Sequence, residues 1–323
     1  MNDAELAGLI TRLRELIETH YLFPDVAARI SGVLADGLSQ GRYPAEEASL
    51  AAAVTADLQS VNGDKHLRLV FREEVLAPRA PGDDSEEFAA MTRWAEQTCG
   101  GVACAQRLTG NVGYLDLQPV LFPAAICADS VTAAMSLLAS TDALIIDLRR
   151  CLGGEPGMVA FLFSYLWDHE PVELTGLRER QGSRLTQWWT LPHVPGRRFG
   201  RARPVYALTS ATTFSGAEQL SFDLQEVGRA SVVGERTRGG ANAREGFVLH
   251  PHLEATISVA EAVSPRTGGN WEGKGVVPDI EVSASSARDE AYGRALRDVV
   301  AAGGPAAAEA QDALTAAQAA PEI

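Results

Sequence analysis

The chain has 323 residues, 46% of them hydrophobic and 22% charged, which is an ordinary globular composition with material for a large core. Its formal net charge of −14 argues against nucleic acid or an anionic membrane as a partner, because both require a basic surface. The four cysteines are scattered without a CxxC pair, so neither a zinc site nor a disulfide framework is expected, and we expect no metal or cofactor.

The N-terminus is acidic and lacks the basic start and unbroken apolar run of a secretory signal. There is no window of about 18 consecutive apolar residues, so no membrane-spanning helix is predicted. The cytoplasm is therefore the expected location. The sequence leaves open whether the chain forms a homo-oligomer.

Residues 1–72 predict a small helical domain that includes a first strand. Apolar residues recur at helical spacing up to about His20, Pro24 suits the first turn of a second helix, and a third helix is expected from Pro44 to Gln59. A strand is expected over 66–72. Residues 73–110 are predicted to be a linker, marked by Pro, Gly and Asp at 78–84, with one helix from Glu86 to Gln97.

Residues 111–285 predict an α/β core, because strands and helices alternate there. Strands are expected at 113–117, 143–148 and 204–209, helices at 128–138, at 156–167 and from Ser215 onward, and short strands over 231–264. The remaining residues, 286–323, predict one helix to about Val300 and then an Ala-rich tail.

The stretch from Tyr206 to Glu218 predicts a buried strand, a hydroxyl-rich turn and a helix that opens at Ser215. A serine at that junction lies where free backbone N–H groups and the positive end of the helix converge, so negative charge near its oxygen is stabilised. Serine is also a common N-cap residue, so a nucleophilic role for Ser215 depends on partners elsewhere in the chain.

Three further segments supply such partners. His66 stands at the mouth of a strand within Asn62–Leu67, Gly153 and Gly154 follow the buried strand that ends near Leu148, and Glu272 lies in the segment Asn270–Ile280. In this order and spacing the four segments resemble the S41 peptidases, over about residues 21–282. The similarity is closest to the branch that includes the interphotoreceptor retinoid-binding-protein-like and tricorn-like members.

The resemblance implies a crotonase-like α/β core preceded by a helical domain. The interval from Phe71 to Asn111 is too short for a PDZ domain of about 80–90 residues, so none is expected. It also implies a cofactor-independent serine peptidase that acts on a peptide or protein substrate through an acyl-enzyme. Tail-specific members use a lysine some two dozen residues after the serine. Here residues 237–240 hold no lysine, and Arg238 cannot release its proton near neutral pH.

The tricorn-like arrangement is therefore implied. Ser215 is the expected nucleophile, His66 the base, and Glu272 the residue that orients the histidine. The oxyanion hole would combine the N–H of Gly216 with an N–H from the Gly153/Gly154 loop.

Two positions depart from the family pattern. Cys151 stands where the diglycine motif usually has Asn, and Lys65 stands where tricorn-like enzymes have a serine that relays between glutamate and histidine. Either Glu272 contacts His66 directly, or Asp64 or a water substitutes. Glu272 could also be a surface residue beside Lys274.

Other assignments stay open at this stage. Asp147 and Arg149 are expected to form a structural pair at a strand end, and Trp188 and Trp189 could line a substrate groove or form an apolar flap. Because fold does not fix function, two alternatives to a peptidase remain: a binding module for hydrophobic ligands, or a hydrolase of small esters or amides.

Overall fold

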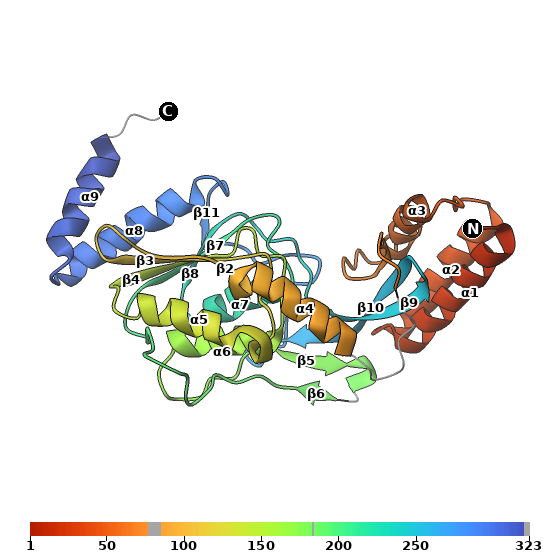
Figure 1. The fold of residues 1–323 in the computed structure, drawn as a ribbon, viewed down its shortest axis with the longest axis horizontal. Coiled ribbons are helices and arrows are strands. Elements are labelled where there is room, and N and C mark those ends of the chain that lie inside the picture. The colour runs from red at the N-terminus through yellow and green to blue at the C-terminus, as the bar shows by residue number, and fades with distance from the viewer. Residues whose placement is uncertain (77–84, 183, 320–323) are drawn as a thin grey trace. The chain divides into compact units, whose positions relative to one another are not determined.

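The computed structural model describes residues 1–76, 85–182 and 184–319 (Figure 1). The residues at 78–84 that were predicted to mark a linker lie outside this range. Contacts divide the chain into two units that are each discontinuous in sequence. Unit 1 comprises Met1–Glu86, Gly176–Gln187 and Gly240–Gly273, and unit 2 comprises Glu87–Thr175, Trp188–Gly239 and Lys274–Ile323.

Unit 1 packs three helices against one face of an antiparallel sheet. The helices are α1 (Asp3–His20), α2 (Pro24–Ser39) and α3 (Glu47–Gln59), and the strands are β1 (Arg68–Phe71), β5 (Gly176–Glu179), β6 (Leu185–Thr186), β9 (Ala243–His250) and β10 (Leu253–Val263). Asn2 caps α1 in a reciprocal capping box with Glu5, and Pro24 occupies the first turn of α2. Apolar residues from all three helices share one core with β1 and β10.

β10 is the central strand of this sheet and pairs with β1, β5 and β9. It has 11 residues, so the expectation of short strands throughout 231–264 is wrong for this segment. Its first six residues are buried between the helices and the neighbouring strands. This burial stabilises a strand that is longer than expected.

Unit 2 is built around a six-stranded sheet in the order β11-β8-β7-β4-β3-β2. The strands are β2 (Val102–Leu108), β3 (Val112–Leu117), β4 (Ala143–Asp147), β7 (Val205–Thr209), β8 (Ser231–Gly234) and β11 (Ile280–Glu281). All neighbours are parallel except β2, which runs antiparallel to β3. The segments that follow β4, β7 and β8 therefore leave the sheet at one edge, where ligands bind in open α/β sheets.

Helices cover both faces of this sheet (Figure 1). One face packs against α5 (Ala124–Leu138), α6 (Pro156–Leu166) and α7 (Gly216–Glu226), and the opposite face packs against α8 (Ala287–Ala302) and α9 (Ala307–Ala319). Residues 158–166 of α6 are all buried. This double coverage explains why β3, β4 and β7 are mostly apolar and buried along their whole length.

The prediction of a mixed α/β fold with an N-terminal helical region is confirmed. The finer prediction of a crotonase-like core and the predicted boundaries at 72, 110 and 285 stay predictions. Between Phe71 and Asn111 the described residues form α4 (Ser85–Gln97), a short 3-10 helix (Cys99–Gly101) and β2. The helix was predicted and the strand was not.

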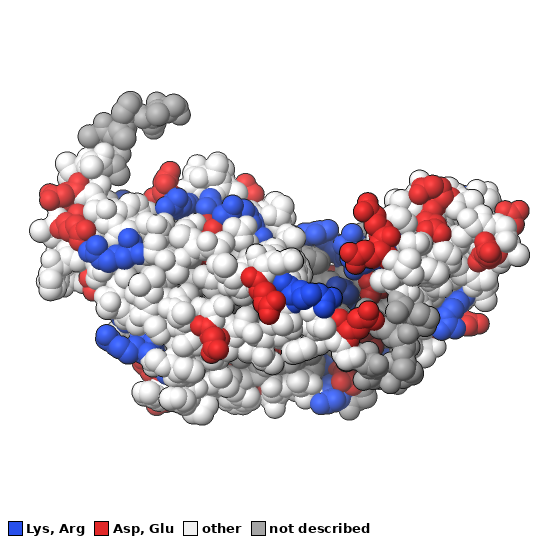
Figure 2. All heavy atoms as spheres, in the orientation of Figure 1, with Lys and Arg blue, Asp and Glu red and all other residues white. Residues whose placement is uncertain are grey.

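Within the described residues, no helix is both long enough and apolar enough to span a membrane. On the visible face of unit 1 acidic side chains predominate, whereas on unit 2 both signs are interspersed (Figure 2).

Candidate active site

Ser215 lies in a strained turn between β7 and α7. Its backbone has φ +51° and ψ −122°, and among the described residues it is one of three non-glycine residues with positive φ. Such a conformation costs about 1–3 kcal/mol and persists only where the surroundings enforce it. A sharp strand-to-helix turn of this kind presents a serine hydroxyl at the sheet edge, and the serine is half-buried there.

The diglycine loop after β4 lies directly against this serine. A Cβ added to Gly153 would lie 2.9 Å from the Ser215 Cβ, and one added to Gly216 would lie 2.4 Å from the Gly154 carbonyl oxygen. Gly153 and Gly154 have φ of +130° and +139°, which favours glycine in both positions. The structure thus brings together Ser215, Gly216, Gly153 and Gly154, four of the six predicted site residues.

Three amides at this place are available as donors. The N–H groups of Gly153, Gly154 and Gly216 donate none of the hydrogen bonds found among the described residues. Gly216 also begins α7, where the helix dipole favours negative charge. Together these groups can stabilise an oxyanion that forms on a substrate carbonyl near Ser215.

The loop is held by hydrogen bonds on both sides. Leu121 N–H donates to the Gly153 oxygen (2.8 Å), Glu155 N–H donates to the Leu121 oxygen (2.9 Å), and Phe214 N–H donates to the Cys151 oxygen (3.2 Å). Cys151 is fully buried, and its thiol lies 3.5 Å from the Gly153 oxygen. Burial raises the pKa of this thiol to about 12, so it stays protonated, and the loop forms without the family's Asn.

Glu218 is a buried carboxylate beside Ser215, and sequence reasoning did not assign it. It is 0% exposed, and its Oε2 accepts the Ser215 N–H at 2.8 Å. Its Oε1 accepts the Thr237 hydroxyl at 2.5 Å and the Gly239 N–H at 2.6 Å. Glu218 therefore ties the serine turn to the segment after β8. The Ser-x-x-Glu spacing of a capping box was the available sequence signal.

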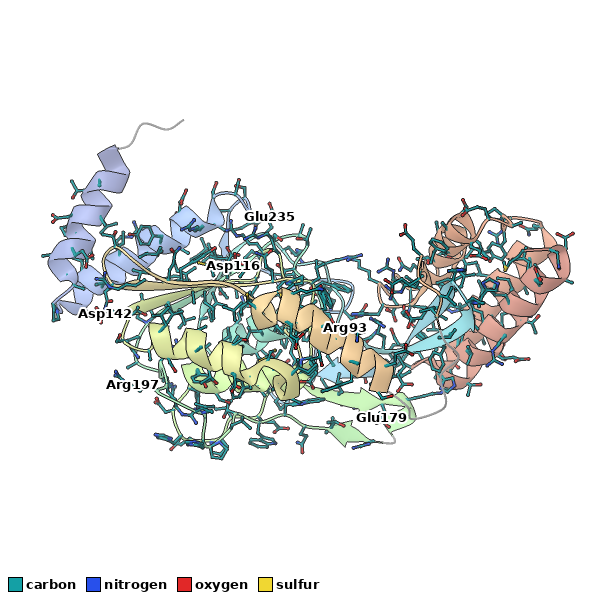
Figure 3. The ribbon with its side chains drawn as sticks, viewed as in Figure 1. Arg93, Asp116, Asp142, Glu179, Arg197 and Glu235 are labelled. Atoms are coloured by element: carbon teal, nitrogen blue, oxygen red, sulfur yellow. The ribbon has the colours of Figure 1, made fainter. Side chains whose placement is uncertain are left out.

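Two ion pairs lie at the same edge of the sheet. Asp147 binds Arg149 (2.5 Å) and accepts the Tyr114 hydroxyl (2.7 Å), as expected for a structural pair. Burial would raise the pKa of Asp147, but the hydrogen bonds from Arg149 and Tyr114 outweigh burial and hold it below its usual value. Asp116, labelled in Figure 3, pairs with Arg150 at 2.5 Å, and its pKa is raised by burial and by the neighbouring Asp147.

His66 and Glu272 belong to unit 1, whereas Ser215 belongs to unit 2. His66 is 6% exposed, and its backbone N–H donates to Asp64 Oδ1 at 3.0 Å. Asp64 is itself buried, and its Oδ2 accepts the Tyr21 hydroxyl (2.9 Å) and the Asn242 amide (3.2 Å). Asp64 thus fixes the backbone at His66, and burial and the Asp64 charge raise the pKa of Tyr21.

Glu272 is connected to the same network. Its Oε2 accepts the backbone N–H groups of Ala241 (2.5 Å) and Asn242 (3.0 Å), and its charge contributes to the raised pKa of Tyr21. His66 and Glu272 are therefore linked through Asp64 and Asn242. Glu272 is half-buried and held by two backbone donors, so it is not an isolated surface carboxylate.

The two tryptophans of the variable segment differ in exposure. Trp188 packs against the core of unit 2, and its carbonyl accepts the Leu174 N–H. Trp189 is 45% exposed. Trp188 is therefore partly buried against this core.

Comparison with known proteins identifies the family. The fold is mixed α/β, with a serine turn at the edge of its parallel sheet. Residues 111–282, more than half of the chain, match the model of peptidase family S41, and residues 3–99 match the N-terminal domain of peptidase S41 in eukaryotic IRBP. The chain belongs to peptidase family S41 and is a serine-type peptidase.

Solved structures with a similar fold include three peptidases. A putative peptidase from Parabacteroides merdae has 16% sequence identity and a TM-score of 0.56, with 86% of this chain and 89% of that chain covered. The photosystem II D1 C-terminal processing protease has 15% identity and a TM-score of 0.50, with 88% and 94% covered. The tricorn protease has 13% identity and a TM-score of 0.55, with 97% and 36% covered. At these identities the likeness concerns the fold.

Proposed function

We propose that the protein hydrolyses peptide bonds through an acyl-enzyme formed on Ser215. The observation that carries the proposal is the strained Ser215 turn, which lies against the Gly153/Gly154 loop with three amides available as donors. Membership of the S41 family supports a peptide or protein as substrate.

In this mechanism His66 removes the proton from the Ser215 hydroxyl while the oxygen attacks the peptide carbonyl carbon. The carbonyl oxygen becomes an oxyanion that accepts hydrogen bonds from the amides of Gly216 and the Gly153/Gly154 loop. His66 then gives its proton to the nitrogen as the C–N bond breaks and the amine leaves. Water repeats the sequence on the acyl-enzyme, which releases the acid and restores the serine.

Glu272 is the proposed carboxylate partner of His66. The Asp64 carboxylate binds the His66 backbone and two polar side chains, so its role is to position the histidine's strand. The backbone amides of residues 241 and 242 hold the Glu272 carboxylate in place. Its proposed role is to orient the His66 imidazole. The assignment of Glu272 rests on the family resemblance.

A fluorophosphonate probe tests the nucleophile, because it reacts covalently with activated serines. We expect labelling at Ser215 and loss of both labelling and hydrolysis in Ser215→Ala, by at least about 1,000-fold in turnover. Ser286→Ala is the matched control, since Ser286 is the N-cap residue of α8 in the same unit. Normal hydrolysis by Ser215→Ala would refute the assignment.

The base is tested by the pH profile. We expect kcat/KM to rise with pH through one ionisation of the histidine kind, and His66→Ala to lose this activity. Silence toward the probe combined with tight binding of an apolar ligand would instead indicate a binding module.

A further inference from the structure

Asp116, at the end of β3, binds the loop that carries Gly153 and Gly154. Its Oδ2 accepts a hydrogen bond from the Arg150 guanidinium at 2.5 Å, and Arg150 lies in the first part of this loop after β4. Asp116 is buried, whereas Arg150 is exposed. Burial and, to a smaller extent, the Asp116 charge raise the pKa of Cys151, the next residue of the loop. The Asp116 carboxylate therefore lies beside the start of the diglycine loop.

This ion pair belongs to a series of contacts between the end of β3 and the loop. Beyond Asp116 the chain continues beside the loop, where the Leu152 N–H donates to the Pro119 oxygen at 2.7 Å. The Leu121 N–H then donates to the Gly153 oxygen at 2.8 Å. The two backbone hydrogen bonds fix the loop next to the diglycine pair, and the ion pair fixes it where it leaves β4. The ion pair is the contact in this series that depends on charge.

The surroundings of Asp116 hold charges of both signs. The charged and titratable side chains around it come from β2, from β3, from β4 and its loop, and from α8: Cys104, Tyr114, Asp147, Arg149, Arg150 and Arg288. Within the part of the chain that the structure describes, the buried Oδ1 of Asp116 accepts no hydrogen bond. A buried carboxylate oxygen without a donor favours the neutral form of the group.

The pKa values of the two neighbouring carboxyl groups move in opposite directions. Burial and the charge of Asp147 raise the pKa of Asp116, and Arg150 and Arg149 offset this only in part. Asp147 has a pKa below its usual value, because Arg149 and Tyr114 bind its ionised form. As the pH falls, Asp116 therefore takes up a proton before Asp147 does.

We propose that Asp116 is a positioning residue whose ionised carboxylate, acting through Arg150, holds the diglycine loop in the geometry that binds the oxyanion. A neutral group at this position binds the guanidinium more weakly, so the loop amides move relative to Ser215 and the reaction slows. The inference rests on the proposed function, because the oxyanion forms only in that reaction.

Protonation of Asp116 affects activity and stability in opposite directions. Because the pKa of Asp116 is raised in the folded state, the folded chain binds this proton more tightly than the unfolded chain does. Protonation of this group therefore adds to the free energy of unfolding while it slows the reaction. A loss of activity through Asp116 at acid pH is then not a consequence of unfolding, and a merely structural ion pair would not produce it.

The test compares the rate of Ser215 labelling by a fluorophosphonate probe in the wild type and in Asp116→Asn across pH. The phosphoryl oxygen of the probe takes the place of the oxyanion, and both proteins share the ionisation of His66, which cancels in the ratio of their rates. We expect Asp116→Asn to react about 10-fold more slowly at pH 7, a smaller effect than the loss of a whole oxyanion-hole donor. The ratio should approach 1 at acid pH, where Asp116 is protonated in the wild type.

The partner residue and a control separate this pair from other surface ion pairs. Arg150→Gln should slow labelling as much as Asp116→Asn, and the double variant should lose no more than either, because the pair acts as a unit. Arg107→Gln is the matched control and should keep the wild-type rate, because Arg107 forms its ion pair with Glu309 (2.6 Å) in the same unit. Wild-type rates in both single variants, or a ratio that stays near 10 at acid pH, would overturn the inference.

Amide hydrogen exchange gives a readout without any reaction at Ser215. At pH 7 the loop amides of Leu152 and Glu155 should exchange about 10-fold faster in Asp116→Asn than in the wild type, and Arg107→Gln should show no change. That result supports the role of Asp116 even if Ser215 fails to label. Unchanged exchange in Asp116→Asn would overturn it, while labelling of Ser215 still tests the proposed function.

Discussion

Replacement of Glu218 tests whether the buried carboxylate holds the serine turn. Its two oxygens accept three donors, the N–H groups of Ser215 and Gly239 and the hydroxyl of Thr237. An apolar substitution would leave all three without a partner. At about 1–3 kcal/mol for each buried donor, that loss of about 3–9 kcal/mol is comparable to the entire stability of a typical domain.

Glu218→Gln is the informative change, because the amide has the same shape but only one acceptor oxygen. That oxygen can keep the two donors from Thr237 and Gly239, and the NH₂ group then faces the Ser215 N–H. The buried Ser215 N–H then has no acceptor from this side chain, so the free energy of unfolding should fall by about 1–3 kcal/mol. The positive φ at Ser215 also loses its support, and kcat should fall by roughly 100-fold through displacement of the Ser215 hydroxyl.

Urea unfolding and peptide hydrolysis measure the two effects on the same samples. Glu235→Gln is the matched control: its carboxylate also accepts two backbone amides, but Glu235 is only half-buried and water can replace the lost acceptor. We expect the control to stay within about 0.5 kcal/mol of wild type. If Glu218→Gln unfolded at the wild-type urea concentration with normal kcat, the carboxylate would not be what holds the turn.

Three further predictions concern unit 2. Gly153→Ala places a Cβ 2.9 Å from the Ser215 Cβ and should reduce turnover about 100-fold, whereas Gly228→Ala, also at positive φ but in open space, should keep it. Burial raises the pKa of Asp223 to about 6, above about 4 in an unfolded chain, so the folded state retains a proton that the unfolded state loses between pH 4 and 6. Stability should therefore fall as pH rises through that range, by on the order of 3 kcal/mol in urea unfolding, and Asp223→Asn should abolish the fall. Iodoacetamide should label exposed Cys99 in the folded protein and spare buried Cys151, as mass spectrometry would show; early labelling of Cys151 would contradict the burial.

The meeting of Ser215 with the diglycine loop could be predicted because it depends on a regular feature of the fold. Parallel strands end at one edge of a sheet, so the residues that follow β4 and β7 converge whatever the loops contain. The buried strand β4, apolar except for Asp147, and the helices flanking it carried a strong sequence signal. Likewise α1 and α2 follow from apolar spacing and from Pro24.

Elements without periodic burial could not be predicted in this way. β2 alternates poorly, since four of its seven residues are half-buried and none is fully buried, and it becomes a strand because β3 offers it an edge. β10 lies in the region 231–264, where only short strands were expected. Its length is set by three pairing partners distant in sequence.

Glu218 shows where local reasoning stops. The spacing Ser-x-x-Glu predicts a glutamate in the first turn of a helix, where such a residue is ordinarily exposed and contributes a modest cap. It becomes a buried support for the serine because Thr237 and Gly239, about twenty residues later, donate to its second oxygen. The same two residues flank Arg238 and fix its backbone beside Phe214. The carboxylate that supports the Ser215 turn thus also fixes the segment after β8, so a change at Glu218 should disturb both segments.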